Sequence, residues 1–138
     1  NLNLSKDELC EIAVKRGADV PFFVYEYDSA NVTGIGEVVK KFDEEVLNID
    51  TITPKIKCNT GEIFNIFREK FYKQISKEES NRLLQMKSID ILKEFDIKKA
   101  NDLYEPALSL YSDLEDYSKK DWYFSGSGSS FFKVNNGK

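Results

Sequence analysis

Residues 16–23 have the sequence RGADVPFF, and residues 122–132 have the sequence WYFSGSGSSFF. The first stretch places one carboxylate, Asp19, between the expected end of a helix and an apolar segment. The second places a Gly/Ser loop between two aromatic segments that are typical of β-strands. The chain has no histidine, which excludes His-based acid–base catalysis and most zinc sites. The pattern therefore favours transfer chemistry that depends on positioning and electrostatics.

The composition excludes several classes of protein. A chain of 138 residues is long enough for one domain with a real core. Its formal net charge of -4 argues against nucleic-acid binding, because no basic face is implied. No apolar run approaches the roughly 18 residues of a membrane span, so no membrane partner is expected. Cys10 and Cys58 lack metal-ligand spacing and indicate reduced thiols in a cytoplasmic protein.

The N-terminal part of the chain predicts one helix and two strands. Ser5 and Glu8 have the spacing of a capping box, so a helix is expected to begin there. Gly17 is expected in the left-handed position that ends this helix. Residues 21–25 (PFFVY) predict a short apolar strand, and residues 30–42 predict a strand that bends at its glycines.

A polar break at residues 43–45 predicts a domain boundary, which divides the chain into 1–45 and 46–138. The second part begins with a strand at 46–52 and is then mostly helical to residue 121. The first expected helix has an apolar stripe at Ile63, Phe64, Phe67 and Phe71. Two short helices are expected at 83–86 and 89–95. The last is an amphipathic helix whose apolar stripe is Leu103, Ala107, Leu110, Leu114 and Tyr117. With strands on both sides of the Gly/Ser loop, the fold class is α+β.

Asp19 is the candidate catalytic residue. A carboxylate between a helix and an apolar segment can accept a hydroxyl proton, or bind a metal, at the floor of a cleft. The more common role of such an aspartate is to satisfy backbone donors in a connecting turn.

The Gly/Ser loop is the candidate phosphate-proximal site, and its residues are Ser125, Gly126, Ser127, Gly128 and Ser129. Glycines allow the backbone to approach a ligand, and consecutive amides can bind phosphate oxygens. The alternatives are a plain hairpin turn or a flexible linker, and the bulky strands on both sides disfavour a linker.

Thr60 and Phe64 are the candidate substrate-binding residues. Their spacing of four places them on one face of a helix. An aromatic ring there can stack on a flat ligand such as a base, with the hydroxyl beside it. The alternative is a helix cap followed by a core phenylalanine. No protein-built metal site is expected.

The order of six motifs resembles the GHMP kinase superfamily over essentially the whole chain. The motifs are LSxDEL, GADVPFF, GxGE, NTGEIF, NDLYEPA and SGSGSSFF. Within the superfamily, the chain is most similar to the kinases that act on a cytidine diphosphate derivative in non-mevalonate isoprenoid biosynthesis. The resemblance implies a GHMP-kinase fold, in which residues 1–45 end the N-terminal domain and residues 46–138 form a ferredoxin-like α/β C-terminal domain.

The resemblance also implies the chemistry. Such enzymes transfer the γ-phosphoryl group of ATP, with Mg²⁺, to an alcohol group of a small molecule. Asp19 would be the catalytic residue, and the Gly/Ser loop would lie near the phosphates. Thr60 and Phe64 would hold the cytidine group, although Gly61 follows this threonine where relatives often have Pro or Ala. The Asn101-Asp102 pair would have a mainly structural role.

Several elements of the superfamily are absent from the chain. They are an early catalytic lysine, a second aromatic residue for the cytosine, a PxxxGLGGGSSDAA phosphate loop and a final helix. The chain is therefore expected to be roughly the second half of an enzyme and inactive by itself. Two alternatives stay open, namely another kinase of the superfamily, for homoserine or mevalonate, and a non-catalytic ferredoxin-like binding module.

Overall fold

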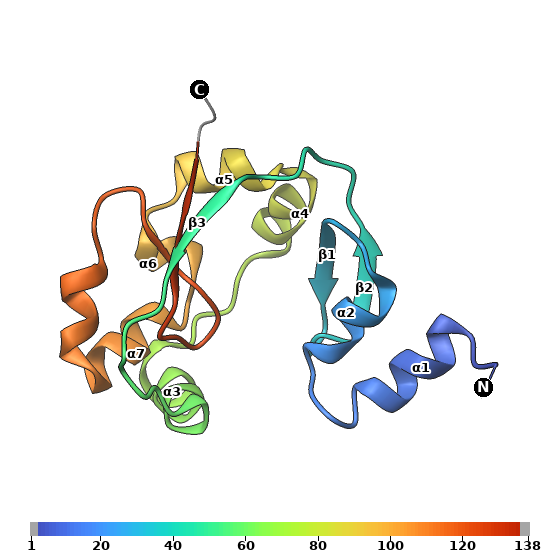
Figure 1. Cartoon of the computed structure of the whole chain (residues 1–138), viewed down its shortest axis with the longest axis horizontal. Helices are drawn as coiled ribbons and strands as arrows, with labels where there is room; N and C mark the ends of the chain where they lie inside the picture. Colours follow the sequence, from blue (N-terminus) through green and yellow to red (C-terminus); the bar gives the residue numbers. More distant parts are fainter. Residues whose placement is uncertain (1–2, 136–138) are drawn as a thin grey trace. The chain divides into compact units, whose positions relative to one another are not determined.

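The computed structural model describes residues 3–135, which form α-helices and two small antiparallel sheets (Figure 1). The α+β class predicted from the sequence is therefore confirmed. The chain consists of two compact units, and the division falls between Val46 and Leu47. No helix in residues 3–135 is long and apolar enough to cross a membrane.

The first unit begins with helix α1 (Lys6–Ala13). The predicted capping box is confirmed, because the Glu8 N–H donates to Ser5 Oγ at 3.2 Å and the Ser5 N–H donates to Glu8 Oε2 at 2.8 Å. Cys10 and Ala13 are the buried residues of this helix. The helix ends at Ala13, before Gly17, and Gly17 does not have the positive φ that was expected of it.

Residues 21–25, predicted as a strand, instead form helix α2 (Val20–Tyr25). Five apolar residues in a row have no period that separates a buried strand from a short helix. Pro21 lies in the first turn of α2, where its fixed φ suits a helix and its missing N–H costs nothing. The helix is also held by α1, since the Tyr25 hydroxyl donates to Asp7 Oδ1 at 2.8 Å. This bond raises the pKa of Tyr25 above its ordinary value.

The segment predicted as one bent strand forms a hairpin of two strands, β1 (Ala30–Thr33) and β2 (Val38–Lys41). Their antiparallel register pairs Ala30 with Lys41 and Thr33 with Val38. The glycines that were expected to bend a strand lie in the connecting turn, and both have positive φ.

The second unit contains a three-stranded antiparallel sheet with the order β3-β5-β4. Its strands are β3 (Ile49–Ile52), β4 (Tyr123–Phe124) and β5 (Phe131–Val134), and Figure 1 shows β3 beside the last strand of the chain. In the register, Ile52 pairs with Phe131, and Phe131 pairs with Phe124. All three predicted strands of this unit are present.

Helices and tight turns connect these strands. In chain order they are α3 (Thr60–Ile66), a π-helical turn (Phe67–Phe71), α4 (Lys77–Gln85), α5 (Ser88–Glu94), α6 (Ile97–Ala100), α7 (Tyr104–Leu110) and a 3₁₀ turn (Ser112–Tyr117). The core of the unit joins α3 and α7 to the sheet through Ile63, Tyr104, Ala107, Leu114, Phe124 and Phe131.

The single amphipathic helix expected around residues 103–117 is broken at Tyr111. The backbone leaves the helical region there (φ -130, ψ 77), and the Tyr111 hydroxyl accepts a hydrogen bond from the Asn59 N–H at 2.9 Å. Because the break changes the direction of the chain, Leu114 is fully buried whereas Leu110 is 39% exposed. The predicted buried stripe was therefore wrong at Leu110.

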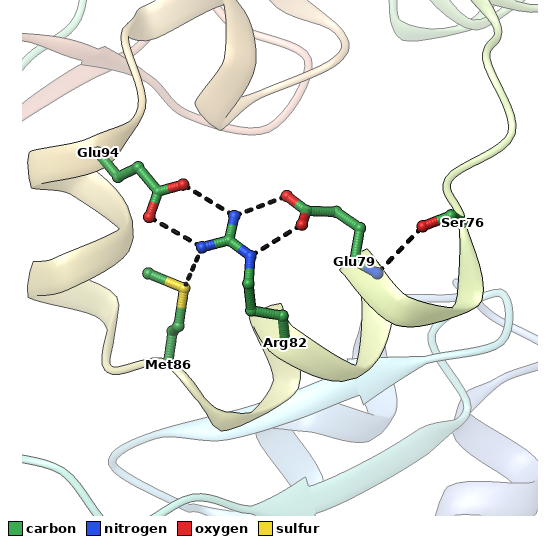
Figure 2. Close-up of polar contacts among 5 residues, drawn as sticks. All are labelled: Ser76, Glu79, Arg82, Met86 and Glu94. Atoms are coloured by element: carbon green, nitrogen blue, oxygen red, sulfur yellow. Dashed lines mark hydrogen bonds and ion pairs between the residues drawn. The ribbon is translucent and has the colours of Figure 1, made fainter.

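Helices α4 and α5 are joined by one arginine (Figure 2). The Arg82 guanidinium donates to Glu79 at 2.7 and 2.8 Å and to Glu94 at 2.8 and 2.9 Å, while its Nη1 also contacts Met86 Sδ at 3.3 Å. At the start of α4, Ser76 Oγ accepts from the Glu79 N–H at 3.1 Å. Hydrogen bonds from Arg82 lower the pKa of both glutamates and raise that of the arginine.

Candidate functional site

Asp19 immediately precedes α2 in the first unit. Its backbone is helical (φ -86, ψ -13), and its side chain does not cap the helix. The residue is exposed, and its carboxylate has no hydrogen-bond or ion-pair partner in the described part of the chain. The common role of a turn aspartate, which is to bind backbone donors, is therefore not what this side chain does.

Two glycines surround the backbone at Asp19. A Cβ atom on Gly17 would lie 3.0 Å from Asp19 Oδ1. A Cβ atom on Gly36, in the β1–β2 turn, would lie 1.9 Å from the carbonyl oxygen of Ala18. The sequence indicated these glycines only as a helix end and a bend, because the approach of residue 36 to residue 18 is a tertiary contact.

The Gly/Ser loop connects β4 to β5 in the second unit. The Ser125 N–H donates to the Ser130 carbonyl at 2.9 Å, and the Gly128 N–H donates to the Ser125 carbonyl at 3.0 Å. A Cβ atom on Gly128, which has a φ of 93, would lie 2.4 Å from Phe124 Cζ. Only a glycine therefore allows the chain to turn this tightly over the core phenylalanine.

Three serine hydroxyl groups between β4 and β5 bind the start of α3 and the segment that precedes it. Ser127 Oγ lies 2.7 Å from Thr60 Oγ1, and Ser130 Oγ lies 2.8 Å from Thr53 Oγ1. Ser129 is buried and donates to the Pro54 carbonyl at 2.7 Å. The structure thus brings Thr60 and the Gly/Ser loop together, although 67 positions separate Thr60 from Ser127.

Phe64 lies one turn after Thr60 on α3 and is 38% exposed, whereas its neighbour Ile63 is fully buried. The helix is capped by Asn59, whose Oδ1 accepts from the Glu62 N–H at 3.2 Å. The alternative of a Thr60 cap followed by a core phenylalanine is therefore wrong. Both side chains are free of the core, and the Phe64 ring has accessible surface for a planar ligand.

Asn101 holds the loop from the side of α6 and α7. Its Nδ2 donates to the carbonyl oxygens of Phe124 at 3.0 Å and Gly126 at 2.9 Å, and its Oδ1 accepts from the Leu103 N–H at 2.9 Å. The sequence motif indicated a structural role for this residue without indicating what it binds. The pairing with residues more than 20 positions away has no signal in a single sequence.

Two further features complete the chemistry of the described residues. They contain no group of three or more His, Cys, Asp or Glu side chains that could hold a metal ion. Both cysteines are free, and burial raises the pKa of the Cys58 thiol, which lies under the loop near Gly128.

A surface cavity of about 660 Å³ lies in the second unit, at the opposite end of the β4–β5 hairpin from the Gly/Ser loop. Phe95, Trp122, Tyr123 and Val134 contribute to its lining, and none of the predicted site residues does. The predicted site residues of this unit therefore lie outside this cavity.

Comparison with known proteins gives strong matches, although no protein-family model matches the chain. A protein of Sulfurimonas denitrificans named 4-diphosphocytidyl-2-C-methyl-D-erythritol kinase is 48% identical over 97% of this chain and 50% of its own length. Proteins with the same name from Sulfurovum sp. and Campylobacter jejuni subsp. doylei are 40% and 34% identical over 95% and 97% of the chain. The chain spans about half the length of these curated relatives.

A crystal structure of a 4-(cytidine 5'-diphospho)-2C-methyl-D-erythritol kinase matches the fold. The match covers 98% of this chain and 49% of the crystallised chain, with a TM-score of 0.65 and 23% sequence identity. The chain thus has the GHMP-kinase fold that its motifs implied. Over the half of their length that it spans, the chain belongs to the family of the 4-diphosphocytidyl-2-C-methyl-D-erythritol kinases.

Proposed function

We propose that this chain forms about one half of an ATP-dependent kinase that phosphorylates the 2-hydroxyl of 4-diphosphocytidyl-2-C-methyl-D-erythritol in isoprenoid biosynthesis. The observation that carries the proposal is 48% identity over 97% of the chain to a protein of that name. The enzyme would be cytoplasmic, with residues 1–45 as the end of its N-terminal domain and residues 46–138 as its C-terminal domain.

Asp19 is the general base of the proposed reaction. It accepts the proton of the substrate hydroxyl while the hydroxyl oxygen forms a bond to the γ-phosphorus of ATP. The bond between this phosphorus and the bridging oxygen breaks, and ADP leaves with the electron pair. The exposed carboxylate supports this role, since it is not engaged by any partner in the described residues.

The Gly/Ser loop lies next to the phosphates in the proposal. The backbone N–H groups of Gly126 and Ser127 donate to no acceptor within residues 3–135, so they can donate to phosphate oxygens. When bound with the nucleotide, Mg²⁺ would neutralise part of the phosphate charge, held mainly through phosphate oxygens and water.

Thr60 and Phe64 bind the cytidine group in the proposal. The exposed ring of Phe64 can stack on cytosine. The hydrogen bond between Thr60 and Ser127 connects this nucleoside end of α3 directly to the phosphate end of the site.

The test is a coupled kinase assay on the full-length protein that contains this chain, with ATP, Mg²⁺ and the cytidine diphosphate substrate. Asp19→Asn should lower kcat by about 10²–10⁴-fold, because a general base is lost. Asp28→Asn is the matched control, since Asp28 is another exposed aspartate of the first unit. Turnover of Asp19→Asn within about threefold of wild type would reject the role of Asp19.

The substrate class is tested in the same assay. Cytidine monophosphate should compete with the substrate, because the proposed site binds the cytidine group. A folded full-length protein without turnover, or turnover that cytidine monophosphate does not affect, would favour a kinase for another alcohol or a binding protein.

A further inference from the structure

The side-chain amide of Asn101 reaches two peptide groups of the Gly/Ser loop at once. Its Nδ2 donates to the carbonyls of Phe124 and Gly126, at 3.0 and 2.9 Å. Its orientation is fixed at the other end, where Oδ1 accepts from the Leu103 N–H at 2.9 Å. Both N–H donors of the amide and its oxygen are thus engaged between the α6–α7 connection and the loop.

Because the peptide bond is planar, a contact that fixes a carbonyl group also fixes the direction of the N–H group in the same peptide. In a trans peptide the C=O and N–H groups point in opposite directions. The peptide whose carbonyl is on Phe124 carries the N–H of Ser125, which points into the hairpin and donates to Ser130 at 2.9 Å. The peptide whose carbonyl is on Gly126 carries the N–H of Ser127, which points away from Asn101 and meets no acceptor in the described residues.

We propose that Asn101 is a positioning residue that fixes the peptide between Gly126 and Ser127 so that the Ser127 N–H donates to a phosphate oxygen of the nucleotide. This inference rests on the proposed function, because the kinase reaction supplies the phosphate. Asn101 would thus contribute to nucleotide binding by orienting the loop, without touching the nucleotide itself.

Within the described residues, Asn101 is the group that binds the carbonyl side of this peptide. A Cβ atom on Gly126 would meet no atom within 4 Å, and the residue has a φ of 55 that glycine adopts without cost. The Ser127 side chain is held separately by Thr60 at 2.7 Å. The peptide is therefore held by Asn101 on its carbonyl side and by Thr60 through the following side chain.

The isosteric change Asn101→Asp tests the proposal in the full-length protein. It keeps the acceptor for Leu103 but places a carboxylate oxygen against two carbonyl oxygens, so the peptide should turn. We expect kcat/KM for ATP to fall by about 10- to 100-fold, while KM for the cytidine diphosphate substrate stays within about threefold. Asn81→Asp, the same change at an exposed residue of α4, is the control and should have no effect.

The outcomes separate the two proposals. An inactive wild-type protein would refute the proposed function. An active wild-type protein in which Asn101→Asp leaves kcat/KM for ATP unchanged would refute the positioning role alone. A KM for the cytidine diphosphate substrate that rises as much as kcat/KM for ATP falls would also refute it, since a general structural defect would affect both substrates.

A measurement on the wild-type protein does not depend on the folding of the variant. In a ¹⁵N–¹H spectrum, the Ser127 amide should shift on addition of ATP and much less on addition of adenosine, which lacks phosphates. The amide hydrogen of Ser127 should also exchange faster than that of Ser125, which is bonded within the hairpin. A Ser127 amide that is protected from exchange, or that responds equally to ATP and adenosine, would overturn the inference.

Discussion

At the scale of single residues, the position of Asp19 depends on neighbours that lack side chains. Gly17 leaves room for the carboxylate, and Gly36 allows the β1–β2 turn to approach the backbone of Ala18. Both glycines belong to sequence motifs, but the motifs do not show that Gly36 approaches Ala18, because that contact is tertiary. The motif therefore predicted the carboxylate, whereas the residues that determine its position became visible only in the tertiary structure.

Gly36→Ala should destabilise the protein and disturb Asp19. The new Cβ atom would lie 1.9 Å from the Ala18 carbonyl oxygen, at a φ of 121 that alanine rarely adopts. We expect a loss of about 2 kcal/mol or more in the free energy of unfolding, measured by urea denaturation. Gly61→Ala is the matched control, because its Cβ would meet its nearest atom at 3.4 Å and alanine favours helices. Equal stability of the two variants would contradict this account of Gly36.

At the scale of elements, the sequence predicted helices and strands correctly where contacts between nearby residues determine the structure. The capping box of α1 and the strands that flank the Gly/Ser loop are present as predicted. The errors have tertiary causes: PFFVY forms a helix that is bonded to α1 through Tyr25 and Asp7, and the long helix breaks where Tyr111 binds Asn59. The motifs predicted candidate site residues, but the bond between Thr60 and Ser127 spans 67 positions and has no local signal.

The contact between α4 and α5 predicts a dependence of stability on pH. Hydrogen bonds from Arg82 lower the pKa of Glu79 and Glu94 below their ordinary value of 4.5. Their contribution is therefore complete above pH 4.5 and decreases as the pH falls through the lowered values, because the unfolded state then binds more protons than the folded state.

Arg82→Gln should therefore lower the Tm at neutral pH and make the Tm fall less steeply on acidification. Arg68→Gln is the control, since within residues 3–135 Arg68 bonds to the amide oxygen of Asn65 and to no carboxylate. The measurement is thermal unfolding of wild type and both variants at a series of pH values from neutral to acid. A wild-type Tm that falls in parallel with that of Arg82→Gln would show that the arginine does not stabilise the two carboxylates.

At the scale of the whole molecule, the predicted site residues belong to two different units. Thr60, Phe64 and the Gly/Ser loop belong to the second unit, which contains the large buried cluster. Asp19 belongs to the first unit, in which Phe23 and Ile35 are 69% and 75% exposed. Among the described residues, most of the buried hydrophobic side chains belong to the second unit, whereas the carboxylate lies on the first.

The 138-residue chain alone should not turn over. The Asp19 carboxylate of the first unit has no ion-pair partner in residues 3–135. Phosphoryl transfer, however, requires cationic groups around the reacting phosphate. The chain also spans about half the length of its relatives, so we expect the remaining cationic and phosphate-binding groups to come from the other half. The check is the coupled assay with the chain alone and with the full-length protein at equal concentration. ATP-dependent phosphorylation by the chain alone would contradict this prediction, whereas turnover only in the full-length protein would support it.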